Sequence, residues 1–205
     1  MAAPSGPRVF RVALQPPDLG RIAAAADVLR RGGLVAFPTE TVYGLGADAT
    51  NPAAIERLNA VKGRPPEKPY SWHLHSKEQI RRFVSDVPPL AQRLIERFWP
   101  GPLTIIFPAR DGKTIGFRLP DHPVAQAFLK ACDVPVAAPS ANRSGARPPT
   151  NGPGVLAALE SDFDALLDAG PTTVGLESTV VAVTGQKVTV LREGAISTDA
   201  IHKLL

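Results

Sequence analysis

The chain is predicted to fold as one α/β domain, in which helices flank a twisted sheet of mixed parallel and antiparallel strands. In the first half of the sequence, segments with helical spacing of apolar residues alternate with short apolar runs. That order is typical of strands joined by packed helices. In the second half, strand-like segments are joined by short turns that indicate antiparallel hairpins. The length of 205 residues suits one well-buried core better than two.

The first half opens with a helix expected over residues 19–31. Asp18 is a favourable N-cap, and Gly32-Gly33 ends the helix because glycine readily adopts the conformation that follows a last turn. The next elements are a buried strand, a helix opened by Thr50 or Asn51, a short strand and a helix, expected over residues 34–37, 52–61, 70–75 and 88–98.

Two hairpins are expected in the second half. The first joins residues 103–107 to 114–118 through Asp111-Gly112, and the second joins residues 178–183 to 188–192. The other elements are a helix, a strand, a helix, a strand and a final helix, expected over residues 122–131, 134–138, 155–160, 165–168 and from about 198 onward. Residues 140–154 are rich in Pro, Gly, Ser and Asn and are expected to form a long functional loop.

The domain is expected to span residues 8–205, with residues 1–7 as a flexible tail. The N-terminus lacks the charged start and apolar block of a secretory signal. No apolar run reaches the roughly 18–20 residues that span a bilayer. We therefore expect a cytoplasmic protein that does not enter a membrane.

The composition argues against several kinds of site. The single cysteine, Cys132, excludes an intramolecular disulfide and a thiolate metal cluster, and it is expected to be a buried structural thiol. His73 and His75 share a strand face, but no nearby carboxylate completes a metal site, so no bound metal is expected. The net charge of +4 permits an anionic ligand. The aromatic content of 6% and the lack of a basic run weaken any base-stacking interpretation.

Residues 35–49 carry the strongest functional signal. An apolar run ends at a proline, and Thr39, Glu40, Thr41 and Tyr43 then crowd into a loop closed by two glycines. Core packing does not require these side chains together, whereas a small polar ligand requires oriented donors and acceptors on a rigid backbone. The loop therefore predicts a site for a small polar ligand.

The glycines of this stretch also match the G-x-G-x-x-G/A pattern of dinucleotide-binding turns. The match at Gly44, Gly46 and Ala49 is weak, because a polar loop separates it from the preceding strand. The acidic residue about 20 positions further on, Glu67, lies between prolines instead of at a strand end. The sequence contains neither a P-loop motif nor the G-x-S-x-G motif of serine hydrolases.

Other segments add charged and polar groups. Lys62, Arg64 and Lys68 lie in a loop stiffened by prolines and suit phosphate recognition, although a basic surface loop has the same composition. Residues 140–145 supply short donors and acceptors after a buried strand, where α/β sheets bind ligands, although a plain turn has the same composition. Residues 177–179 and 192–194 lie at strand ends with the same two interpretations. The signal comes from all of these segments occurring together.

In this order, the segments resemble those of one family, the YrdC-like threonylcarbamoyl-AMP synthases. The matching segments are residues 38–46, 62–65, 99–104, 139–142 with 144–145, 177–180 and 192–194. The resemblance covers about residues 18–194, and its most specific part is the combination of Lys-x-Arg with Ser-x-Asn. The chain ends soon after the last segment, so it resembles the short, single-domain members. The fold that the resemblance implies is a YrdC-like sheet with a concave basic cleft.

Roles for individual side chains are implied by the resemblance. Threonine would contact Thr39, His73, Arg118 and Ser178, with its carboxylate held by Arg118 through a bidentate pair. ATP would lie against a larger set, Lys62, Arg64, Lys68, Thr114, Ser140, Asn142 and Arg192. The residues expected to be catalytic are Lys62, Arg64, Ser140 and Asn142.

Two positions depart from the family pattern. Position 68 is Lys where many members carry Asn, a change that still favours phosphate. Position 148 is Pro where a serine commonly contacts the nucleotide, so that contact is not expected.

Members of this family condense L-threonine, bicarbonate or CO2, and ATP to threonylcarbamoyl-AMP and pyrophosphate. The chain would then be a nucleotidyltransferase of tRNA threonylcarbamoyladenosine modification, with ATP as a substrate and Mg²⁺ accompanying it. Its partners would be threonylcarbamoyl-transferase proteins, with tRNA as a further ligand to test. No dedicated general base is evident, so alignment and electrostatic stabilisation are expected to carry catalysis.

Two alternatives remain open at this level. The first is a module of the same fold that binds tRNA or double-stranded RNA without synthase activity, which strongly salt-dependent binding would indicate. The second is a carbamoyl-transfer domain that acts on another acceptor. Such domains usually belong to larger chains, and incubation with carbamoyl phosphate would separate this activity from the synthase.

Overall fold

The computed structural model describes residues 6–64, 69–108, 112–160 and 162–205. Its strands are β1 Arg8–Arg11, β2 Val35–Phe37, β3 Gly44–Asp48, β4 Trp72–His73, β5 Leu103–Pro108, β6 Thr114–Arg118, β7 Val136–Ala137, β8 Ala165–Asp168, β9 Thr179–Thr184 and β10 Lys187–Arg192. Its helices are α1 Leu19–Arg30, α2 Pro52–Lys62, α3 Pro89–Phe98, α4 Pro123–Cys132, α5 Gly152–Leu159 and α6 Thr198–His202, with a 3-10 helix, η1, at Lys77–Arg82.

The strands form one ten-stranded sheet in the order β1-β8-β2-β3-β7-β4-β6-β5-β9-β10. The sheet combines parallel pairs (β1–β8, β8–β2, β4–β6 and β5–β9) with antiparallel ones, which include both predicted hairpins, β5–β6 and β9–β10. The prediction of an α/β fold with a mixed sheet flanked by helices is confirmed. The boundary between a domain over residues 8–205 and a tail stays a prediction, and residues 1–5 lie outside the described residues.

Helix starts follow the local signals in the sequence. The Asp18 side chain accepts a hydrogen bond from the Arg21 N–H at 3.0 Å, and the Asn51 side chain caps α2 in the same manner. After α1, Gly32 has a φ of +85°, the left-handed conformation that glycine adopts without strain. At the end of α4, Cys132 is buried as predicted.

The glycine-containing part of the predicted polar loop differs from its prediction. Residues 44–48 form the buried strand β3 and are not part of a loop, so only residues 38–43 connect β2 to β3. A Cβ atom on Gly46 would lie 3.1 Å from a ring carbon of Phe37 and 3.1 Å from a methyl carbon of Val136. A larger residue would press against both neighbouring strands, so close packing favours glycine here. Because these glycines lie within a strand, they do not form the strand-to-helix turn of a dinucleotide site.

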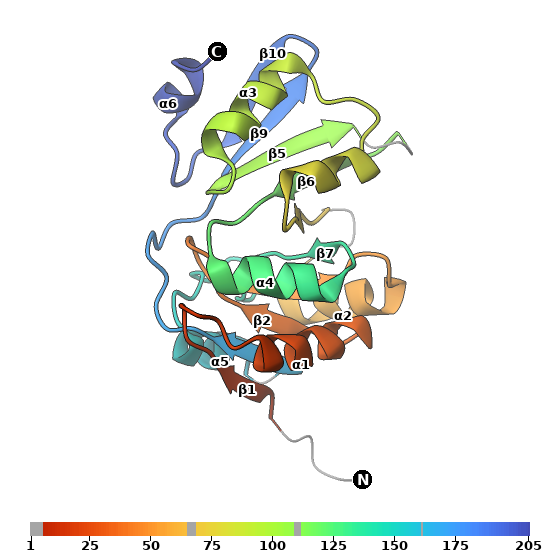
Figure 1. Ribbon diagram of the computed structural model, residues 1–205, viewed down its shortest axis with the longest axis vertical. Helices are drawn as coiled ribbons and strands as arrows, with labels where there is room; N and C mark the ends of the chain where they lie inside the picture. Colours follow the sequence, from red (N-terminus) through yellow and green to blue (C-terminus); the bar gives the residue numbers. More distant parts are fainter. Residues whose placement is uncertain (1–5, 65–68, 109–111, 161) are drawn as a thin grey trace.

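The two halves of the sheet are covered differently (Figure 1). Val35 and Phe37 of β2 pack with α1 and α4, whereas Ala36 and the preceding Leu34 pack with α2 and α5 on the opposite side. Both faces of this half are therefore buried beneath helices.

The other half has a single hydrophobic face. Ile105, Phe117 and Val181 of β5, β6 and β9 pack with residues of α3 and α6. Successive side chains of a strand point to opposite faces, so the alternate residues of these strands face away from that core. No helix among the described residues is long and apolar enough to cross a membrane.

His122 caps α4, and its lowered pKa predicts that the stability of the protein depends on pH. Its side chain accepts from the Ala125 N–H at 3.4 Å, and burial lowers the pKa of His122 from 6.5 to about 4. The unfolded chain therefore binds more protons between these values, so stability is full above pH 6.5 and declines as the pH falls towards 4. By pH 5 we expect His122 to account for a loss of about 1–2 kcal/mol in the free energy of unfolding.

The measurement is urea unfolding of the wild type and of His122→Asn at pH 7 and pH 5. Asparagine keeps an N-cap acceptor but does not titrate in this range. The variant should therefore lose less stability between the two pH values. An equal loss in both proteins would contradict the assignment.

Candidate active site

A cavity of about 490 Å³ lies over the uncovered face of the sheet, between the β5, β6 and β9 strands and the loops that follow α2 and β7. The alternate residues Thr104, Arg118 and Val180 line it from β5, β6 and β9. Eight predicted site residues line this one cavity: Lys62, Arg64, His73, Arg118, Ser140, Asn142, Ser178 and Arg192. Tertiary structure therefore brings together side chains that the sequence places in separate segments.

Three predicted site residues are not in this lining. Thr39 is 1% exposed, and it does not line the cavity. Thr114 lines a separate cavity next to Phe107 and Thr184. Lys68 lies outside the described residues. The ligand contacts assigned to these three residues, like those assigned to the eight in the lining, stay predictions.

Lys62 ties the end of α2 to the loop after β7. Its Nζ donates to the carbonyl oxygen of Ser140 at 2.5 Å and to that of Asn142, while the Lys62 carbonyl accepts from the Ser144 N–H at 2.8 Å. Burial, and next the positive charge of Arg64, lowers the pKa of Lys62 to about 8. Lys62 therefore holds the 140–144 loop and keeps a positive charge at neutral pH.

Arg64 and Asn142 form the neighbouring wall. Arg64 donates from Nη2 to the Pro69 carbonyl at 3.0 Å, and its guanidinium lies 4.8 Å from the Tyr70 ring centroid. Asn142 donates from Nδ2 to the carbonyls of Arg143 and Ala146, which folds the loop back on itself. Among the described residues, Arg64 Nε and Asn142 Oδ1 are buried without a hydrogen-bond partner. Both side chains therefore keep unused polar capacity beside the cavity.

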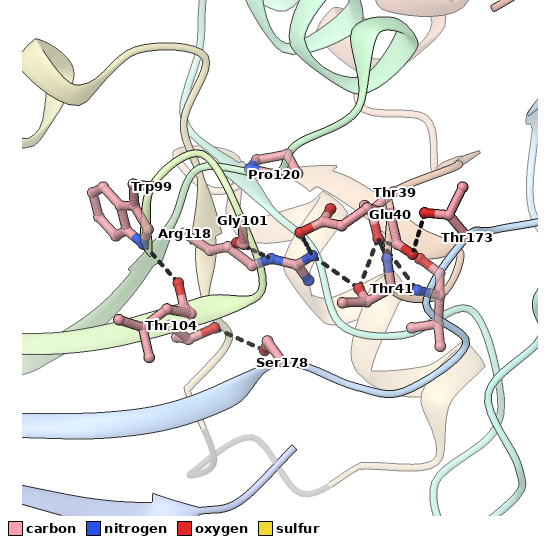
Figure 2. Close-up of polar contacts among 12 residues, drawn as sticks. Thr39, Glu40, Thr41, Trp99, Gly101, Thr104, Arg118, Pro120, Thr173 and Ser178 are labelled. Carbon is pink, nitrogen blue, oxygen red and sulfur yellow. Dashed lines mark hydrogen bonds and ion pairs between the residues drawn. The ribbon is translucent and has the colours of Figure 1, made fainter. Parts of the chain in front are cut away.

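Arg118 is held on one side by the predicted polar loop (Figure 2). Its Nη2 lies 2.8 Å from Glu40 Oε1, an ion pair in which both side chains are buried, and donates to Thr41 Oγ1 at 2.8 Å. Its Nε donates to the Gly101 carbonyl at 3.4 Å. Nη1 donates to no described residue.

The Thr39 hydroxyl is used within the same loop. It donates to the Val42 carbonyl at 2.7 Å and accepts from the backbone N–H groups of Thr41 and Val42. Its oxygen also lies 2.9 Å from Thr41 Oγ1. Because a hydroxyl has one hydrogen, Thr41 must be the donor to Thr39. Direct contact between Thr39 and a ligand would need a change in this loop.

His73 lines the cavity as a neutral imidazole. Burial, and next the positive charge of Arg118, lowers the pKa of His73 to about 3. Its ring packs edge-on against Phe37, with centroids 6.0 Å apart. Nδ1 is buried and has no hydrogen-bond partner among the described residues. The imidazole can therefore form a neutral hydrogen bond to a ligand but does not provide a positive charge.

Ser178 and Arg192 form the wall from the last hairpin. Ser178 Oγ lies 3.0 Å from Thr104 Oγ1, and Arg192 donates from Nη2 to the Ser178 carbonyl at 2.9 Å. Arg192 Nη1 also pairs with Glu177 at 3.0 Å. A Cβ on Gly194 would lie 2.3 Å from the Glu177 carbonyl oxygen, so this position requires glycine.

The charges of the cavity are partly compensated. Arg118 and Arg192 are paired with Glu40 and Glu177, whereas Lys62 contacts carbonyl oxygens and Arg64 a carbonyl oxygen and an aromatic ring. The predicted basic character of the cleft therefore stays a prediction. Within the described residues, no group of three or more His, Cys, Asp and Glu side chains could hold a metal ion.

Sequence reasoning assigned no role to several residues of this site. Thr104 and Glu177 line the cavity, whereas in the sequence they stand out only as members of motifs. Glu40 was singled out for its place in a polar loop, but its partner was not identified. The negative charge of a buried carboxylate must be balanced by a partner, so a carboxylate in such a loop is a signal for a nearby cation. The sequence alone does not say which arginine is that partner.

Fold and site together define an α/β domain with a cavity, lined by many polar residues, on the open face of its sheet. The family model Sua5_yciO_yrdC, described as "Telomere recombination", matches residues 27–194. The chain therefore belongs to the Sua5/YciO/YrdC family, which confirms the family suggested by the motifs.

Individual relatives extend this finding. The Bacillus subtilis (strain 168) protein named threonylcarbamoyl-AMP synthase is 39% identical over 195 residues, which are 90% of this chain and 56% of that protein. The crystal structure of P. abyssi Sua5 complexed with L-threonine has a TM-score of 0.91 at 36% identity, covering 96% of this chain and 60% of that one. E. coli YciO shares the fold, with a TM-score of 0.86 at 24% identity over 95% of this chain and 99% of its own.

The length of these relatives limits what carries over. The chain spans about half the length of the curated relatives from Bacillus subtilis and Pyrococcus abyssi. The family and the fold are therefore shown for this chain, while its activity, substrates and partners are proposals.

Proposed function

We propose that this chain is a threonylcarbamoyl-AMP synthase, which condenses L-threonine, bicarbonate or CO2, and ATP to threonylcarbamoyl-AMP and pyrophosphate. The observation that carries the proposal is the meeting of eight predicted site residues in one cavity. The names of the relatives agree with it, and one neighbouring structure is titled as a complex with L-threonine. These names favour the synthase over an RNA-binding module without this activity.

In this proposal two sets of lining residues bind different substrates. Arg118, His73 and Ser178 would bind threonine, because a guanidinium suits its carboxylate and neutral polar groups suit its remaining polar atoms. ATP would bind against the remaining cationic and polar side chains of the lining: Lys62, Arg64, Ser140, Asn142 and Arg192.

The reaction would follow from this placement. The neutral threonine amine adds to CO2 and releases a proton to solvent, and the resulting carbamate oxygen attacks the α-phosphorus of ATP while pyrophosphate leaves. Lys62 and Arg64 would offset the charge that develops on the phosphates, so the protein acts by alignment and electrostatic stabilisation. Mg²⁺ would enter bound to ATP, because it commonly binds through substrate phosphates and waters. Glu177 is a carboxylate of the lining that could approach it.

The wider role follows from the product. We propose that threonylcarbamoyl-AMP is passed to a transferase that modifies tRNA, and that the chain acts in the cytoplasm. Direct binding of tRNA is a separate question, which salt-dependent binding in the absence of ATP would answer.

The test is pyrophosphate release from ATP, bicarbonate and L-threonine, with a mass spectrum of the product. We expect release to require all three substrates, and independence from threonine would refute the proposal. Arg64→Ala should lower kcat/KM for ATP by about 10²-fold or more, and Ser140→Ala by about 10-fold. Arg57→Ala is the matched control, because Arg57 pairs with Asp164 outside the cavity.

A further inference from the structure

Glu40 is a buried carboxylate whose surroundings provide little compensation. It is 6% exposed, and neither carboxylate oxygen has a hydrogen bond to the described residues. Its charge is balanced by one ion pair, with Arg118 at 2.8 Å (Figure 2). A buried charge is tolerated only with a partner, so Glu40 and Arg118 each depend on the other.

The backbone around Glu40 is fixed from a second segment. The Glu40 carbonyl accepts from the Val174 N–H at 2.8 Å and from the Thr173 hydroxyl at 3.4 Å. The Thr41 carbonyl accepts from the Gly175 N–H at 3.0 Å. These bonds attach the loop to the 173–175 segment, so the backbone that carries the Glu40 side chain is held in place.

A chain of hydroxyls supports the same guanidinium. Arg118 Nη2 donates to Thr41, Thr41 donates to Thr39, and Thr39 donates to the Val42 carbonyl. Together with Glu40 and the Gly101 carbonyl, these groups occupy Nε and Nη2 and leave Nη1 without a partner among the described residues. Arg118 lines the cavity, whereas Thr39, Glu40 and Thr41 do not.

We propose that Glu40 is a positioning residue that fixes the Arg118 guanidinium so that its Nη1 end receives the carboxylate of the amino-acid substrate. The identity of that substrate rests on the proposed function. Glu40 touches no ligand and acts through Arg118. The negative charge of Glu40 by itself would repel a substrate carboxylate on the same guanidinium. Ordering of Arg118 is therefore the contribution that would favour binding.

Glu40→Asp separates position from charge, because aspartate keeps the charge but is one methylene shorter. Displacing a contact by about 1 Å can cost up to about 10²-fold. We therefore expect the KM for threonine to rise about 10- to 100-fold, with the KM for ATP changed less than about 2-fold. Glu96→Asp, on the exposed face of α3, is the matched control. If Glu40 provided charge balance alone, the KM for threonine of Glu40→Asp would stay close to that of the wild type. That result would overturn the proposal.

A conservative pair tests the hydroxyl chain. Thr41→Val removes the oxygen that accepts from Arg118, whereas Thr41→Ser keeps it. We expect Thr41→Val to raise the KM for threonine and Thr41→Ser to restore it. Equal effects of the two substitutions would count against positioning through this chain.

A spectroscopic readout separates failure of this inference from failure of the proposed function. The Arg118 Nε–Hε signal, identified by its loss in Arg118→Lys, should exchange slowly with water in the wild type. It should exchange faster or shift in Glu40→Asp and Glu40→Gln, without any substrate present. An unchanged signal would overturn the positioning role, whereas an altered signal in a protein without threonine-dependent turnover would refute the proposed function alone. Glu40→Asp keeps this test available if Glu40→Gln does not fold.

Discussion

Replacing Lys62 by methionine is expected to lower kcat/KM for ATP by about 10²–10³-fold, the loss typical of removing one preorganised charge from a transition state. Lys62 is 3% exposed and carries a cation into the cavity lining. Its Nζ also holds the carbonyl oxygens of Ser140 and Asn142, so the loop carrying both predicted ATP contacts loses its anchor. Pyrophosphate release at varied ATP concentration measures the effect.

The pKa of Lys62 provides a second signature of the same effect. Because the pKa of Lys62 is lowered to about 8, wild-type kcat/KM should fall as the pH rises through 8, where the neutral amine no longer balances phosphate charge. The kcat/KM of Lys62→Met should not show this decrease between pH 7 and pH 9. Lys130→Met, in the last turn of α4, is the control and should keep full activity. Unaltered ATP use by Lys62→Met in a folded protein would contradict the assignment.

Phe117→Ala is expected to lower the free energy of unfolding by about 3–5 kcal/mol, the range for removing a large buried aromatic side chain. Phe117 is fully buried, and its ring lies 5.9 Å from Trp72, 5.7 Å from Phe83 and 6.2 Å from Phe107. It connects β4, β5 and the residue that ends η1, on the side of the sheet opposite to the cavity. Chemical denaturation of wild type and variant measures the loss.

Phe98→Ala is the comparison for this prediction, because Phe98 is only partly buried at the end of α3. Phe98→Ala should lower the free energy of unfolding by less than half as much as Phe117→Ala. If both variants lost the same free energy of unfolding, the full burial of Phe117 and its aromatic contacts would contribute no extra stability. Because Phe117 precedes Arg118 in β6, its loss should also weaken threonine binding.

The helices and hairpins of this chain were predictable because their signals are local. Asp18 and Asn51 cap their helices through atoms two or three residues away, and the β5–β6 and β9–β10 hairpins pair neighbouring segments. By contrast, β1, β3 and η1 were not predicted. β1 is short and pairs with β8 from the far end of the sequence. β3 is buried throughout and shows no alternation of polar and apolar residues.

The sequence by itself determined the composition of the site, because the polar loop, the Lys-x-Arg and Ser-x-Asn residues and the last hairpin are all visible as motifs. Only the tertiary structure decided which of these side chains face the cavity and which support it. Thr39 was expected to contact substrate, yet its hydroxyl is bonded within its own loop. Glu40 had no assigned role, yet it pairs with Arg118. The physical reason is that a motif fixes which groups are present, whereas burial and pairing depend on strands and loops that are distant in the sequence.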